Sequence, residues 1–327
     1  MERWLVGFAR YLVAQGADVT VLCNEVREDL QGEPGVRFTH LPMARAAKML
    51  TLWRSARRAL ERGGFDAVMG FGRTPGHQLF RAGNGSHADF LRRNHRFRRW
   101  FSPVDWLEAA LDQRAVEGAR IVMANSRLGA EGIRRDYRPK RVEIVYNGVD
   151  LARFAPDPGA RSAMRSALGM NGPTAVFLGS GFRRKGLDVA ISALPASWQL
   201  YVVGNDPAFR APPNVRFLGP VLAPERILQS ADVMILPTRY DPFANSCLEA
   251  LACGVPVLTT SSNGAAEILP EKWMIADNLS DFRAGFQMVS ERLTEASLRD
   301  VCRRTAEQFP AAACYERSFA LLQQASS

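Results

Sequence analysis

The sequence has little cysteine and histidine, and these few residues are scattered. Its five cysteines form no CxxC pair and are odd in number, which argues against a disulfide framework or structural zinc site and favours a reducing cytosol. Four histidines in no cluster argue against a catalytic metal centre. No run reaches the roughly 18 uncharged apolar residues that a membrane-spanning helix needs. An Asp-x-Asp pair and a P-loop are also missing. A GxGxxG fingerprint with a following acid is missing too, which disfavours a dehydrogenase.

The composition is that of a globular protein with an uneven charge. The 327 residues, 47% hydrophobic and 23% charged, are typical of two domains that bury a large core. Residues 1–150 hold 25 Lys and Arg against 17 Asp and Glu, whereas the remainder holds 17 against 16. A basic field confined to one half indicates an acidic partner for that half: nucleic acid, anionic lipid or a phosphorylated acceptor.

Short apolar runs alternate with helical patterns in both halves, which predicts an α/β fold with parallel sheets covered by helices. The predicted strands of the first half are Val19–Cys23, Val36–Leu41, Phe65–Phe71, Ile121–Ala124 and Val142–Tyr146. Those of the second half are Thr174–Leu178, Leu200–Val203, Val215–Leu218, Val233–Leu236 and Val255–Thr259. Glycine and two prolines interrupt the pattern at Asn147–Pro158, so we predict domains at 1–150 and 151–309, followed by a last helix at 310–327.

The first predicted element is a helix, Met1–Gln15, with Trp4, Leu5, Phe8 and Leu12 on one face. A parallel α/β domain normally opens with a strand and a glycine-rich turn. Either this domain opens with a helix, or its first strand is missing from the sequence, and we expect the second.

A glycine-rich segment, Gly179–Gly186, follows a predicted strand and precedes a predicted helix. Its glycines allow close approach of backbone to a ligand, and Arg183, Arg184 and Lys185 add positive charge at the helix start. We interpret it as an anion site, against the alternative of an ordinary strand–helix turn with solvated basic residues.

Two carboxylates, Asp241 and Glu249, lie eight positions apart around a predicted helix start. The loop follows a strand of the second half, and ligands of parallel sheets bind at such strand ends. Backbone N–H groups of the helix start suit a diphosphate, and the carboxylates suit hydroxyl groups. The pair therefore fits a sugar nucleotide, against the alternative of an N-cap aspartate and a surface glutamate.

The segment Phe90–Phe101 carries five arginines and four aromatic residues without an acid. This composition favours an anionic membrane surface, closely followed by a solvated basic helix with a core-facing stripe and distantly by nucleic acid. His77 and His87 follow a predicted strand among glycines. His87 is a candidate site residue, although a lone histidine is more often structural.

Together these motifs resemble glycosyltransferase family 4, retaining enzymes of the GT-B fold, over almost the whole chain. FLGSGFRRKGLDVAISAL is similar to the family's diphosphate loop, YDPFANSCLEALACGVPVLTT to its E-x7-E segment with Asp241 for the first Glu, and VEIVYNGVDLARF to its hinge. VMGFGRTPGHQLFRAGNGSHADFL is similar to the lipopolysaccharide core glucosyltransferase I subgroup, in which Asn84 is often Asp.

The resemblance implies a role for each candidate residue. Arg184 and Lys185 would hold the donor diphosphate, Asp241 would contact the donor sugar, and Glu249 the ribose. Gly179 and Gly181 would approach the donor closely, and Ala244, Asn245 and Ser246 would offer backbone amides to its phosphates. Asn84 and His87 would lie on the acceptor side. Membrane contact would come from Arg92, Arg93, Arg96, Arg98, Arg99 and Trp100.

These roles imply a cytoplasmic glycosyltransferase on the inner face of the membrane. It would move a hexose, glucose, from a UDP-linked donor to a lipid-linked or lipopolysaccharide-core saccharide, with retention, no cofactor, no metal and no nucleic-acid partner. The alternative is a noncatalytic or truncated homologue that binds the nucleotide sugar without transferring it.

Overall fold

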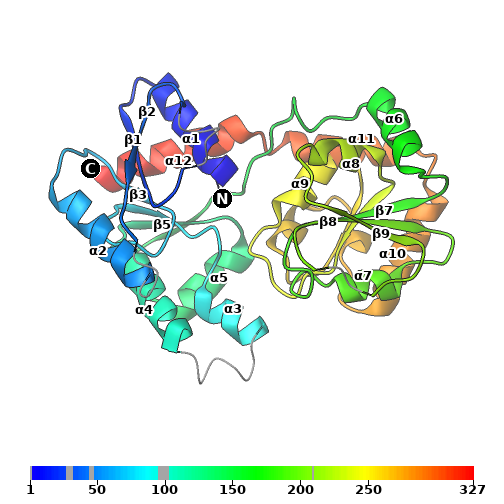
Figure 1. Ribbon diagram of the computed structural model, residues 1–327, viewed down its shortest axis with the longest axis horizontal. Helices are drawn as coiled ribbons and strands as arrows, with labels where there is room; N and C mark the ends of the chain where they lie inside the picture. The colour runs from blue at the N-terminus through cyan, green and yellow to red at the C-terminus, as the bar shows by residue number, and fades with distance from the viewer. Residues whose placement is uncertain (1, 27–31, 44–47, 95–102, 208–209) are drawn as a thin grey trace. The chain divides into compact units, whose positions relative to one another are not determined.

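The computed structural model describes residues 2–26, 32–43, 48–94, 103–207 and 210–327. The chain divides into two compact units, residues 1–145 with 312–327 and residues 146–311. This division falls at 145/146 and 311/312, whereas the sequence interpretation put the boundaries at 150/151 and 309/310. Both units are α/β with parallel sheets, as the sequence predicts (Figure 1).

The second unit is a five-stranded parallel sheet between two helical layers. Its strands are β7 Thr174–Leu178, β8 Gln199–Val203, β9 Val215–Gly219, β10 Val233–Leu236 and β11 Val257–Thr259, in the order β11-β10-β7-β8-β9. Its helices are α6 Pro158–Leu168, α7 Leu187–Ala193, α8 Pro224–Ser230, α9 Asn245–Ala252, α10 Leu279–Glu291 and α11 Ala296–Glu307, with 3-10 turns Gly264–Ile268 and Lys272–Met274. Helices α7 and α10 pack together on one side of the sheet, and α8, α9 and α11 on the other (Figure 1).

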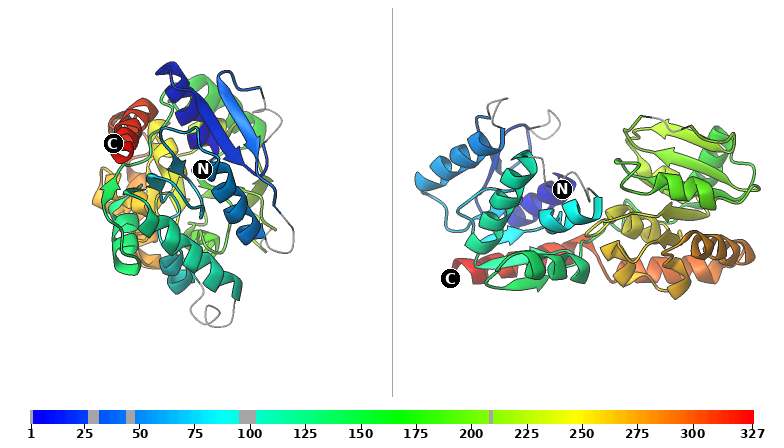
Figure 2. Two further views of the ribbon diagram at one scale, coloured as in Figure 1. Left: turned by 90° about the vertical axis from the view of Figure 1, so that its left-hand side faces the viewer. Right: turned by 90° about the horizontal axis from the view of Figure 1, so that it is seen from below.

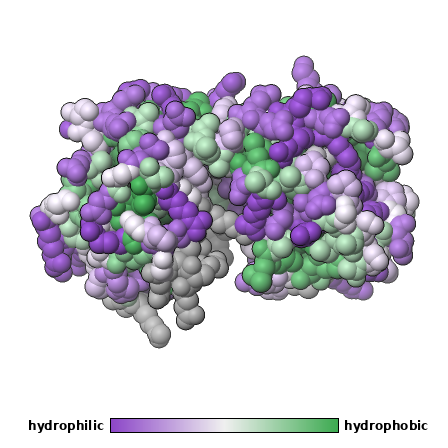
Figure 3. All heavy atoms as spheres, turned by 90° about the horizontal axis from the view of Figure 1, so that it is seen from above, coloured by the Kyte–Doolittle hydropathy of each residue, from purple (hydrophilic) through white to green (hydrophobic). Residues whose placement is uncertain are grey.

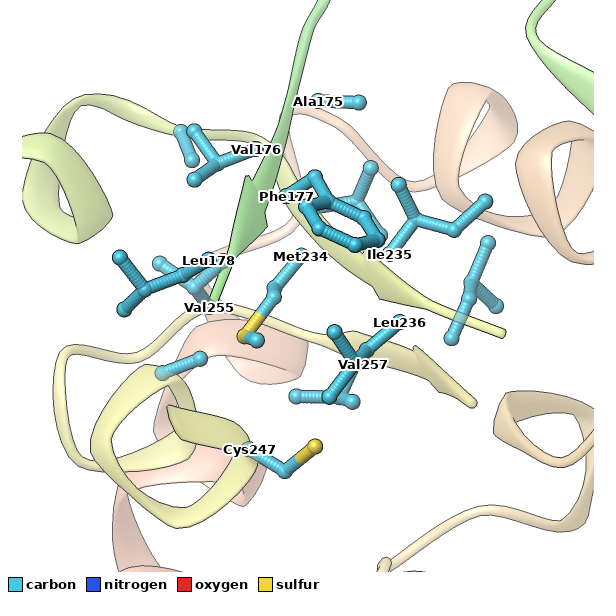
Figure 4. Close-up of a cluster of buried hydrophobic side chains, with 14 of the residues drawn as sticks. Ala175, Val176, Phe177, Leu178, Met234, Ile235, Leu236, Cys247, Val255 and Val257 are labelled. Carbon is cyan, nitrogen blue, oxygen red and sulfur yellow. The ribbon is translucent and has the colours of Figure 1, made fainter. Parts of the chain in front are cut away.

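The core of the second unit is built on its two central strands. Every residue of β7 and β10 is buried, because helices cover both faces of the sheet. Phe177 and Leu236 carry the packing between sheet and helices, and Cys247 of α9 lies in the same cluster (Figure 4). The carboxyl ends of these strands are thus held rigidly, and they carry the candidate site.

The first unit contains two separate parallel sheets in the part that the structure describes. Strands β1 Val19–Cys23 and β2 Val36–His40 pair with each other, and β3 Met69–Gly70, β4 Leu79–Arg81, β5 Ile121–Ala124 and β6 Val142–Ile144 form the second sheet in that order. The helices are α1 Glu2–Ala14, α2 Lys48–Glu61, α3 His87–Asn94, α4 Pro103–Gly118, α5 Arg127–Asp136 and the C-terminal α12 Ala311–Ser326.

Strand β5 shows how the first unit packs. Successive side chains of a strand point to opposite faces. Ile121 and Met123 accordingly join Trp4 of α1 and Leu321 of α12 in one apolar cluster. Val122 and Ala124 of β5 join residues of helices α4 and α5 in a second cluster. The last helix therefore returns to the N-terminal elements (Figures 1 and 2).

Hydrophobic residues also reach the surface. On the face drawn in Figure 3 they form separate patches with hydrophilic residues between them. No helix in the described ranges is both long and apolar enough to cross a lipid bilayer.

Candidate active site

The glycine-rich loop follows β7 and adopts backbone angles that favour glycine. Gly179, Gly181 and Gly186 have φ of 147°, 79° and 76°. A Cβ on Gly186 would lie 2.0 Å from the Pro237 carbonyl oxygen, at the end of β10. The loops after β7 and β10 therefore approach each other closely, and this approach requires glycine.

The side chains of these two loops form a charged cluster. Lys185 Nζ donates to Asp241 Oδ2 at 3.1 Å, and Arg184 Nη1 lies 3.4 Å from the same oxygen. Arg184 also donates to the Tyr240 carbonyl at 3.2 Å. Only 12% of the Lys185 side chain and 13% of the Asp241 side chain are exposed, against 32% for Arg184. Two cations thus share one carboxylate in a partly shielded site, which leaves one positive charge for an anion.

A buried asparagine holds the start of α9. Asn263 is fully buried, and its Oδ1 accepts from the N–H groups of Ala244 and Ala265, at 3.1 Å each. Its Nδ2 donates to Thr259 Oγ1 at 3.0 Å and to Cys247 Sγ at 3.3 Å. In this structure the Ala244 N–H is taken by Asn263, so its predicted contact with the donor phosphates would require this hydrogen bond to be exchanged.

The next residues of α9 remain candidates for the donor. Asn245 is exposed and Ser246 partly exposed at the first turn, and Asn147 Nδ2 donates to Asn245 Oδ1 at 2.6 Å. Glu249 is half-buried one turn further along α9. The structure thus places the segment around Asp241 and the first turns of α9 at the carboxyl end of β10, as the motif predicts.

Cys247 lies beneath this cluster and is not a nucleophile. Burial raises the pKa of its thiol to about 12, with Asp241 and Glu249 raising it further and Lys185 lowering it. The thiol stays protonated at physiological pH and serves in packing.

A second loop contacts the glycine-rich loop. Asp206, after β8, accepts from the Gly181 N–H at 2.5 Å and from the Phe182 N–H at 3.3 Å with the same oxygen. Ser180 Oγ accepts from the Asn205 N–H at 3.1 Å. These hydrogen bonds hold the loops after β7 and β8 together; we call the two bonds to Asp206 the latch.

The first unit has its own polar cavity, of about 290 Å³. Exposed Asn84 and buried His87, the two predicted acceptor-side residues, both line it. Arg73, Arg81, Glu108 and Asp112 complete its polar lining. The wall also includes the aromatic rings of Phe71, Phe80 and Phe90. Aromatic faces beside carboxylates and an amide suit a polyhydroxylated ligand.

The polar side chains of the cavity contact one another. Arg73 Nη2 lies 3.0 Å from His87 Nδ1, and Arg73 Nη1 lies 3.2 Å from Glu108 Oε2. Asp112 Oδ2 accepts from the His87 backbone N–H at 3.1 Å and from Tyr137 Oη at 2.7 Å. Burial lowers the pKa of His87, and the Arg73 charge lowers it further.

Two of the arginines predicted to contact a membrane form ion pairs with carboxylates of the first unit. Arg92 Nη2 lies 2.6 Å from Asp136 Oδ1, and Arg93 Nε lies 3.0 Å from Asp89 Oδ1. Both carboxylates are almost fully buried; the Arg92–Asp136 pair joins α3 to α5, whereas the Arg93–Asp89 pair lies within α3. The other predicted contacts, Arg96, Arg98, Arg99 and Trp100, lie outside the described residues.

Several residues of these sites escaped sequence reasoning. Arg73, Glu108 and Asp112 come from different elements without a shared motif, so nothing in their spacing signals contact. Asn263 and Asp206 each lie in a short polar turn after a strand. Such a turn was a usable signal, because side chains there cap neighbouring backbone N–H groups.

Family models match both halves of the chain. Residues 1–153 match Glycosyltransferase Family 4, and residues 172–289 match Glycosyl transferases group 1. A probable transglycosylase of Burkholderia thailandensis is 30% identical over 282 residues, which cover 82% of this chain and 76% of the relative. A D-inositol 3-phosphate glycosyltransferase of Jonesia denitrificans is 30% identical over 61% of this chain, and the match spans about half of that relative, 55%.

Solved structures share the architecture of this chain. WaaG, a glycosyltransferase involved in lipopolysaccharide biosynthesis, superposes with a TM-score of 0.80 at 20% identity, covering 98% of this chain and 95% of that one. Anabaena HepE in complex with UDP gives 0.77 at 16% identity, covering 99% and 96%. The fold is therefore the GT-B fold of glycosyltransferases. By its sequence matches, the chain belongs to the family 4 and group 1 glycosyltransferases.

Proposed function

We propose that the protein transfers a hexose, glucose, from a UDP-linked donor to a lipid-linked or lipopolysaccharide-core saccharide, with retention of configuration. The observation that carries this proposal is the pair of cations, Arg184 and Lys185, that share the single carboxylate of Asp241 at the end of a buried strand. A diphosphate carries the opposite charge and fits beside the glycine-rich loop after β7.

The same arrangement supports the chemistry. The bond between the sugar C1 and the diphosphate oxygen breaks, and the acceptor hydroxyl attacks C1 from the face that the diphosphate leaves. The hydroxyl proton passes to the departing diphosphate. Arg184 and Lys185 stabilise the negative charge that develops there, and Asp241 holds a donor-sugar hydroxyl. We expect no metal. Arg184 and Lys185 would balance the charge of the leaving diphosphate instead.

The donor and acceptor sides are supported by the neighbours' names. HepE has been crystallised in complex with UDP and with UDP-glucose, and WaaG is involved in lipopolysaccharide biosynthesis. The excess positive charge of residues 1–150 fits a phosphorylated, lipid-linked acceptor.

We also propose that the first unit docks on the inner face of the cytoplasmic membrane. Val104 and Trp106, at the start of α4, are 60% and 62% exposed, directly after the arginine-rich stretch. Exposed apolar side chains beside cations are typical of surfaces that bind anionic lipid.

The test is incubation of the full chain with UDP-glucose and lipopolysaccharide-core acceptor. We expect UDP release that depends on the acceptor, and a product whose anomeric proton signal shows the donor's configuration. Binding of the donor without transfer would favour the noncatalytic alternative. Inversion would refute retention, and absence of both binding and transfer with UDP-, GDP- and ADP-sugars would refute the function.

A further inference from the structure

The cavity of the first unit contains a chain of contacts whose hydrogen positions can be deduced. Arginine has only hydrogen-bond donors. Since Arg73 Nη2 lies 3.0 Å from His87 Nδ1, that nitrogen must accept, and the ring proton of neutral His87 must reside on Nε2. Nε2 is buried and lies 3.4 Å from Glu108 Oε2. It makes no hydrogen bond within the described residues.

Burial and the charge of Arg73 favour the neutral state of His87. Arg73 approaches from the loop after β3, and Asp105, Glu108 and Asp112 approach from α4. The three carboxylates would favour a protonated ring, whereas burial and Arg73 oppose it. A proton on Nδ1 would also place two N–H donors, those of Arg73 Nη2 and His87 Nδ1, only 3.0 Å apart with no acceptor between them.

Among the residues linked by these contacts, Glu108 is the one that can reach a ligand. Its side chain is 24% exposed, against 7% for His87 and 8% for Asp112, and it lines the cavity. One of its oxygens is taken by Arg73 and faces His87. A carboxylate oriented in this way can accept hydrogen bonds from hydroxyl groups.

We propose that Arg73 locks His87 as a neutral ring with its proton on Nε2 and orients Glu108 through its own contact with Oε2, and that Glu108 binds a hydroxyl of a saccharide in the first-unit cavity. Arg73 is the positioning residue, and Glu108 is the binding residue. The saccharide part rests on the proposed glycosyltransferase function, whereas the histidine lock does not.

The lock is tested by two-bond ¹H–¹⁵N NMR of the full chain labelled with [¹⁵N]histidine. The His87 signals, identified by their loss in His87→Gln, should show an unprotonated Nδ1 and a protonated Nε2. This pattern should persist below the ordinary histidine pKa of about 6.5. Arg73→Met should release the ring to titrate, and Arg73→Lys, which keeps a donor, should restore the pattern in part. A proton on Nδ1 in the wild type, or ordinary titration there, overturns the lock.

Saccharide binding is tested with oligosaccharide released from lipopolysaccharide core, by saturation-transfer NMR without turnover. Glu108→Gln should weaken binding about ten- to hundredfold, the loss of one hydrogen bond to a charged group. Glu117→Gln, which changes a partly exposed carboxylate of the same helix outside the cavity lining, should bind like the wild type. Equal binding by Glu108→Gln and the wild type overturns the Glu108 assignment. No binding by the wild type overturns the saccharide pocket. If UDP-dependent transfer persists in either case, the proposed function stands.

Discussion

Lys185 Nζ lies 3.1 Å from Asp241 Oδ2, although the two residues are 56 positions apart in the sequence. The contact joins the loops after two adjacent buried strands, β7 and β10. It makes the carboxylate the internal partner of the cation that should hold the donor diphosphate. The positive charge of Lys185 would therefore serve both the contact with Asp241 and the binding of the donor diphosphate.

Lys185→Ala should reduce turnover about 10²–10³-fold, because it removes a cation that stabilises the departing diphosphate in a shielded site. Steady-state kinetics with saturating donor and acceptor measure this loss. The matched control is Arg183→Ala, an exposed neighbour in the same loop, which should retain turnover. Near-normal turnover of Lys185→Ala would remove the assignment.

Asp241→Asn should separate nucleotide binding from transfer. Loss of the carboxylate frees Arg184 and Lys185, so free UDP should bind equally well or a few-fold more tightly, as calorimetry can measure. Transfer should fall, since the contact to the donor sugar is weakened. Glu249→Gln should instead weaken UDP binding through the ribose. Equal weakening of UDP affinity by both variants would contradict this division.

Sequence patterns predicted the buried strands better than the site contacts. Strand β5, Ile121–Ala124, has its predicted bounds, because a strand covered on both faces is apolar throughout. The predicted strand Phe65–Phe71 is reduced to Met69–Gly70, and the three-residue β4 was missed. The motif around Asp241 correctly indicated that the candidate site lies at the carboxyl ends of the strands in the second unit. It could not reveal that Asn263 takes the Ala244 N–H, because that bond depends on tertiary contact.

The arginines of the basic segment should fall into two groups. Replacing Arg96, Arg98 and Arg99 with Gln should release the protein from anionic vesicles, since each cation near such a surface contributes about 1 kcal/mol. Replacing Arg92 and Arg93 should instead lower the thermal stability of the first unit, because their partners Asp136 and Asp89 are buried. Vesicle flotation and thermal unfolding distinguish the two effects. Unchanged flotation of the first variant would argue against membrane docking.

Stability should fall as the pH drops below 6.5. Burial lowers the pKa of His77 and His87 from the ordinary value of 6.5, so the folded protein keeps both rings neutral while the unfolded chain protonates them. Their contribution is fully present above pH 6.5 and is lost as the pH falls toward the folded-state values. Urea unfolding between about pH 7.5 and 5.5 measures this slope before carboxylates titrate. His77→Gln should reduce the slope, and rising stability over that range would contradict the prediction.

Asp206 should set the shape of the glycine-rich loop. Its carboxylate accepts the N–H groups of Gly181 and Phe182, two residues before the cations that face Asp241. In Asp206→Ala these N–H groups lose their partner, and the loop no longer fixes Arg184 and Lys185 before the donor arrives. The donor KM should rise about tenfold, equivalent to about 1.4 kcal/mol, a typical loss for a hydrogen bond to a charged group.

The control variants distinguish this effect from a general loss of stability. Asp206→Asn should retain most donor affinity, because an amide oxygen still accepts from both N–H groups. Asp188→Ala breaks only an exposed ion pair with Arg239 in the same unit and should leave the donor KM unchanged. Thermal unfolding shows whether each variant is folded. A folded Asp206→Ala with the wild-type donor KM would mean that the loop keeps its shape without the latch, and the glycine angles alone would then have to position the two cations.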